Sequence, residues 1–182
     1  MTIRKIIDFL IKVGEERAAE KLKHYYLQKD FKIRETHKRV LLLLFVLGTL
    51  DNPLKVPLRK TAKGDQYNYK RAFWQAIEWL LDRTSNSFKA RFQELKEYTD
   101  WVDSPKTGIY QITTSGILQA RELLTSDYKA REFFMSLVEK LYKKQDKRAK
   151  YLRGVLIKTG NFAPLSREQI NYLLASPMEV SA

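Results

Sequence analysis

The stretch Tyr110-Gln111-Ile112-Thr113-Thr114-Ser115-Gly116 takes the chain from an extended segment directly into a helix. Before it, Ser104-Pro105-Lys106-Thr107-Gly108 has the early proline and late glycine that suit a tight connection, which predicts a β-hairpin over residues 101–112. After it, Thr113 can cap a helix that carries an apolar face, made by Ile117, Ala120 and Leu124. The stretch therefore predicts a hairpin followed at once by a helix.

Three further helices are predicted before this hairpin. The first has Thr36 as its N-cap, and its apolar run covers every face, so other elements must surround it. A long basic loop over residues 51–67 leads to a second helix, capped by Asn68. The polar break at residues 84–87 precedes a third helix, whose inner face consists of Phe88, Phe92 and Leu95.

This order of helix, basic loop, helix, polar break, helix, hairpin and helix resembles the winged helix-turn-helix superfamily. The likeness is closest at Tyr110–Gly116, because many members leave the wing with an aromatic residue, an aliphatic residue, a threonine and, three residues later, a glycine. The chain is similar to MarR and PadR regulators and to the N-terminal modules of Mrr-type restriction endonucleases. The resemblance implies a mainly α protein with a winged-helix domain over residues 36–126, a small β-hairpin wing, and helical extensions over 1–35 and 127–182.

The charge balance favours a polyanionic partner. Lysine and arginine number 34 against 21 acidic residues, which gives a net charge of +13, and nucleic acid is the commonest polyanion that such a field attracts. Apolar residues make up 44% of the chain, enough for a packed core. Together with the resemblance, this predicts a DNA-binding protein: a transcription regulator, or the recognition component of a restriction, mobile-element or defence system.

The third helix, over residues 86–97, is the candidate recognition helix for the major groove. Asn86 and Gln93 can form bidentate hydrogen bonds with adenine, and Lys89 and Lys96 lie along one edge where they can reach phosphates. Ala90, Glu94 and Glu97 are expected on the same outward face, which a solvated amphipathic helix would also show. Lys106 lies at the tip of the wing, where the resemblance implies contact with the minor groove or the backbone.

A second basic element is predicted as one helix over residues 140–153, which contains a single acidic residue, Asp146. Its cations on one face are expected to contact phosphates, namely Lys140, Lys143, Lys144 and Lys147. The basic loop around Arg59 and Lys60 is the next candidate surface.

Apolar stripes in the two extensions predict a homodimer, because regulators of the MarR and PadR type dimerise through flanking helices and a two-fold dimer suits a pseudo-palindromic site. The stripes are Ile3, Ile6, Ile7 and Leu10 at one end, and Phe133, Phe134, Leu137, Val138 and Leu141 at the other. The alternative is that these helices complete a monomeric core.

Two other functions remain open. The winged helix could dock a protein, with the basic surface incidental, or the chain could be a small helical nuclease of the HEPN type. The second rests on the spacing of Arg17 and His24, although Ala18 stands where that pattern usually has a polar residue. A restriction-nuclease metal pattern at Asp82 and Glu94-Leu95-Lys96 is rejected, because both parts lie in helical segments. The chain is therefore predicted not to be an enzyme and to need no cofactor or metal.

The chain is expected to be cytoplasmic. It contains no cysteine, which fits a reducing compartment, and residues 1–13 carry charges that do not suit a signal peptide. The longest apolar run, Val40 to Leu47, is too short for a membrane span, which needs about 20 residues.

Overall fold

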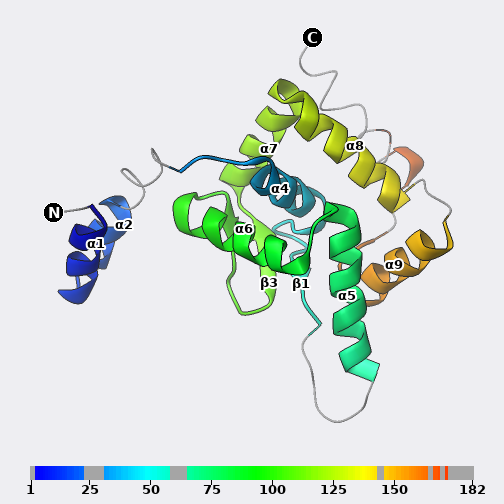
Figure 1. Cartoon of the computed structure of the whole chain (residues 1–182), viewed down its shortest axis with the longest axis horizontal. Helices are drawn as coiled ribbons and strands as arrows, with labels where there is room; N and C mark the ends of the chain where they lie inside the picture. Colours follow the sequence, from blue (N-terminus) through cyan, green and yellow to red (C-terminus); the bar gives the residue numbers. More distant parts are fainter. Residues whose placement is uncertain are drawn as a thin grey trace.

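The computed structural model describes residues 3–22, 31–57, 65–142, 146–163, 166–168 and 171, without the side chains of residues 3–4 and 65–69. The protein is mainly helical, with one small antiparallel sheet (Figure 1). None of the helices within these residues is both long and apolar enough to span a bilayer.

The N-terminal extension forms two short helices, α1 (Ile3–Lys12) and α2 (Glu16–Leu22). Gly14 adopts a φ of +83° between them, a conformation that glycine reaches without steric cost. The two helices pack on each other and bury Ile7 and Ala19, and in Figure 1 the pair lies apart from the other helices.

Helix α4 (Glu35–Leu47) lies at the centre of the remaining chain and packs against α6, α7 and α8 (Figure 1). Its leucines are almost fully buried, as its all-round apolar run predicts. The predicted N-cap is wrong: Arg34, not Thr36, is the N-cap, because the helix begins two residues earlier and includes the buried His37 in its first turn. It ends at Leu47, before Gly48.

The central elements follow in the order β1 (Leu54–Lys55), α5 (Asp65–Leu81), α6 (Ser85–Tyr98), β2 (Val102–Asp103) and β3 (Ile109–Ile112). The strands pair antiparallel in the order β1-β3-β2, with Leu54 opposite Tyr110 and Val102 opposite Ile112. The predicted hairpin is confirmed as β2 and β3. Asn68 was predicted to cap this helix, but it lies inside α5, which begins at Asp65.

Three more helices close the core: α7 (Thr114–Ser126), α8 (Tyr128–Tyr142) and α9 (Lys147–Lys158). Thr113 caps α7, as predicted, with its side chain accepting a hydrogen bond from the Gly116 amide. α8 packs against α4 and α7, and α9 packs against α5. The apolar stripe of α8 is therefore core rather than dimer surface, since Phe134, Leu137, Val138 and Leu141 are buried within the chain.

Candidate nucleic-acid interface

Helix α6 is anchored to the core by one face. Phe88, Phe92 and Leu95 are buried, as predicted from their spacing. The Phe88 ring lies 5.7 Å from the Trp74 ring and 5.1 Å from the Tyr110 ring, centroid to centroid, so the helix packs against both α5 and β3. At its start, the Thr84 side chain accepts a hydrogen bond from the Ser87 amide. The orientation of α6 is thus set at its N-terminal end, where a recognition helix approaches bases.

The opposite face of α6 is exposed, and it carries Asn86 and Gln93 together with Ala90 and Glu97. Lys89 and Lys96 are exposed along one edge of this face. The Lys89 ammonium lies 4.6 Å from the centroid of the Trp74 ring, close enough for a cation–π interaction that holds the lysine beside the helix. Amide side chains flanked by cations on one exposed helix face can reach both base edges and phosphates.

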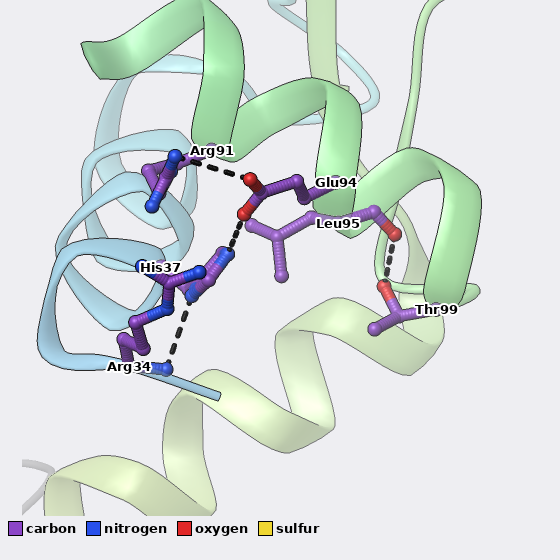
Figure 2. Close-up of polar contacts among 6 residues, drawn as sticks. All are labelled: Arg34, His37, Arg91, Glu94, Leu95 and Thr99. Carbon is purple, nitrogen blue, oxygen red and sulfur yellow. Dashed lines mark hydrogen bonds and ion pairs between the residues drawn. The ribbon is translucent and has the colours of Figure 1, made fainter. Parts of the chain in front are cut away.

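Glu94 does not belong to the outward face, which corrects its predicted position. Its carboxylate turns toward α4, where it meets the imidazole of His37, and it also pairs with Arg91 at 3.1 Å (Figure 2). The reason is that His37 is completely buried and needs a partner for its polar ring. The exposed face of α6 therefore carries Glu97 but not Glu94.

The tautomer of His37 follows from its contacts. The backbone amide of Arg34 donates to its Nδ1 at 3.0 Å, so the proton lies on Nε2 and is donated to Glu94 (Figure 2). At the other end of α6, the Thr99 hydroxyl donates to the Leu95 carbonyl at 2.6 Å. These bonds fasten α6 to α4 and close its C-terminal turn.

The pKa of His37 lies below its ordinary value of 6.5, because burial disfavours the charged imidazolium; the Glu94 carboxylate opposes this shift only in part. An unfolded chain therefore binds a proton more readily than the folded one, so folding stability present above about pH 6.5 is lost as the pH falls below that value. We expect the melting temperature to be lower at about pH 5.5 than at about pH 8.

The control is His37→Gln, which should lower the melting temperature but flatten its pH dependence in this range. Glu35 and Asp127 also titrate, but their pKa values are lowered by Arg39 and Lys38, so their effects come at more acid pH. An unchanged pH profile in the variant would contradict this assignment.

The β2–β3 connection carries the predicted wing residue. Lys106 is exposed there, and its carbonyl accepts a hydrogen bond from the Ile109 amide at 3.1 Å. Gly108, with a φ of +79°, lets the chain turn back into β3. β2 packs against α6, so the hairpin and the exposed face of α6 belong to one structural unit.

The basic segment does not form the continuous helix that was predicted over residues 140–153. α8 ends at Tyr142 and α9 begins at Lys147, because Asp146 is extended and accepts a hydrogen bond from the Arg148 amide at 2.7 Å as an N-cap. The Lys140 ammonium is directed inward and donates to the Trp79 carbonyl at 2.8 Å. Lys147 is exposed on α9, while Lys143 and Lys144 lie outside the described residues.

Three of the remaining candidates fall outside the part of the chain that the structure describes. Arg59, Lys60 and His24 lie outside the described residues, and Arg17 is exposed on α2, so the helical-nuclease pair is described only in part. Among the residues that the structure describes, no cluster of three or more His, Asp or Glu side chains is placed to hold a metal ion.

Two buried polar residues were not singled out from the sequence. His37 shares a helix face with Leu41 and Leu44, at spacings of four and seven. That position in an apolar stripe could have indicated from the sequence that His37 is buried. Asn161 is fully buried after α9, where its side chain accepts from the Lys55 amide at 2.7 Å and donates to the Lys55 carbonyl at 2.9 Å. Such a bridge between distant segments has no local sequence signal.

Comparisons with known proteins identify no family for this chain. A scan against protein-family models, a search of curated proteins and a search of solved structures each found no match to the chain.

Proposed function

We propose that residues 36–126 are a winged-helix module that binds duplex DNA, with α6 in the major groove and the β2–β3 hairpin as the wing. The observation that carries the proposal is the exposed face of α6, where Asn86 and Gln93 lie beside Lys89 and Lys96. The element order also supports the proposal, because it is the order that the resemblance to winged-helix proteins implies: α4, β1, α5, α6, β2 and β3, with a three-stranded sheet.

The chemistry of this face divides into two parts. The amides of Asn86 and Gln93 can donate and accept at once, as the major-groove edge of adenine requires, and therefore supply sequence preference. The ammonium groups of Lys89, Lys96 and Lys106 supply affinity that is independent of sequence, because they neutralise phosphates and release counterions. The inward turn of Glu94 removes one negative charge from the surface that would face DNA.

Assembly as a homodimer remains part of the proposal and now rests on α1, since the α8 stripe is buried. Phe9 and Ile11 of α1 are 60% and 54% exposed, and Val13, directly after the helix, is 53% exposed. A two-fold dimer would present two α6 helices to a pseudo-palindromic site.

The test begins with selection of a preferred site from random duplex DNA, followed by anisotropy titrations across salt concentration. We expect binding that weakens steeply with salt, and a cost of about 1–3 kcal/mol for Gln93→Ala on the preferred site with little change on random DNA. Lys96→Ala should weaken both complexes alike and lower the salt slope by about one unit.

Gln75→Ala is the matched control, because Gln75 is an exposed glutamine on α5. It should leave both affinities unchanged. Absence of duplex binding at about 50 mM salt would overturn the proposal, since that concentration is permissive for non-specific association. An enriched site whose affinity is indifferent to both Gln93→Ala and Asn86→Ala would show that α6 is not the reading helix.

A further inference from the structure

Helix α9 presents a second basic surface, which the α6 proposal does not use. No acidic residue occurs between Lys147 and Lys158. Its apolar side faces the core, with Ala149, Leu152, Val155 and Leu156 buried. In Figure 1, α5 separates α9 from α6, so the two helices do not form one continuous face.

The outward face of α9 combines cations with an aromatic ring. Lys147, Lys150 and Lys158 are exposed, and none of them forms an ion pair with the residues that the structure describes. Tyr151 lies among them with 60% of its surface exposed, although tyrosine rings are usually packed. Helical spacing brings Lys147, Tyr151 and Lys158 to the same side.

Gly154 lies in the middle of this face. Glycine inside a helix is destabilising relative to alanine, and here it has no packing reason, because a Cβ at this position would meet nothing within 4 Å. At spacings of three and four residues, its neighbours on the helix surface are Lys150, Tyr151, Ile157 and Lys158, all of them exposed. A bare helix backbone framed by a ring and by ammonium groups leaves room for a flat or extended ligand to approach closely.

We propose that the outer face of α9 binds single-stranded nucleic acid, with a base stacked on Tyr151, the strand passing over Gly154, and phosphates held by Lys147, Lys150 and Lys158. Exposed aromatic rings between cations suit a single strand because unpaired bases offer free faces, whereas bases in a duplex are already stacked. An anionic membrane surface fits less well, because a membrane-bound helix inserts its apolar face and that of α9 is buried in the core.

The experiment measures anisotropy of a labelled single-stranded oligothymidine of about 15 nucleotides with the full-length chain. We expect Tyr151→Ala to weaken binding about 5- to 150-fold, the range that corresponds to the loss of one stacked base. Tyr151→Phe should restore the affinity, since it keeps the ring. Tyr128→Ala is the control: Tyr128 is 65% exposed on α8, and its loss should have no effect.

Gly154→Ala gives a readout that a purely structural role would not produce. The melting temperature should rise by roughly 2 °C, while single-strand affinity falls roughly fivefold, because the added methyl group holds the strand away from the helix. A variant that is more stable but binds more weakly separates ligand contact from damage to the fold.

Three results would overturn the inference. One is affinity that is unchanged in both Tyr151→Ala and Gly154→Ala, and another is equal loss in Tyr128→Ala. The third is displacement of the strand by vesicles containing phosphatidylserine at matched charge, which would assign α9 to a membrane surface. The inference does not rest on α6, since Gln93→Ala should leave oligothymidine binding unchanged whether or not the duplex proposal holds.

Discussion

Gly116→Ala should destabilise the protein by about 3 kcal/mol, even though alanine is the better helix former. A Cβ on Gly116 would lie 2.0 Å from the carbonyl oxygen of Trp101 and 2.7 Å from Cγ1 of Ile112. The Trp101 carbonyl is not free to retreat, because it accepts the hydrogen bond from the Thr113 amide at 2.9 Å. The first turn of α7 would have to separate from the end of the hairpin.

Gly154→Ala is the matched control for stability. It is also a glycine in a helix, but its Cβ would enter open space, so the same substitution should stabilise by about 0.5–1 kcal/mol. Urea unfolding of both variants measures the difference in sign. Two stabilising substitutions would contradict the close approach of α7 to the strand.

Phe88→Ala should cost about 3–5 kcal/mol, the largest effect that we expect from a single substitution. Phe88 is fully buried and lies among the rings of Trp74, Phe92 and Tyr110, at centroid distances of 5.7, 6.1 and 5.1 Å. Truncation leaves a cavity between α5, α6 and β3. Because the total stability of a domain is about 5–15 kcal/mol, this loss would populate the unfolded state measurably.

The comparison with Gln93→Ala tests the two faces of α6 in one helix. Gln93 is exposed, so its truncation should change the free energy of unfolding by at most about 0.5 kcal/mol. Phe88→Leu should be intermediate, since it keeps part of the buried volume. A cost below about 1 kcal/mol for Phe88→Ala would contradict the packing of α6 on the core.

Local patterns in the sequence were sufficient for several elements. The spacing of Phe88, Phe92 and Leu95 predicted the inner face of α6, since residues three and four apart share a helix side. Thr113 and Gly116 predicted the start of α7, because a side-chain cap acts within one turn. The prediction of one continuous basic helix was wrong. The residues around Asp146 are helix formers, but Asp146 itself is the N-cap of α9 and therefore interrupts the expected helix.

Other features depended on residues far apart in the chain, and only the tertiary structure decided them. Glu94 is outward-facing by helical spacing alone, but His37, fifty-seven residues away, turns it inward because a buried imidazole must be hydrogen-bonded. Lys140 has the sequence position of a surface cation, but its ammonium turns inward and donates a hydrogen bond to the Trp79 carbonyl. Gly116 illustrates the difference between local sequence and tertiary structure. The sequence by itself determined that a helix begins near this position. Only the tertiary structure decided that the position has no room for a side chain, because the Trp101 carbonyl at the other end of the hairpin approaches it closely.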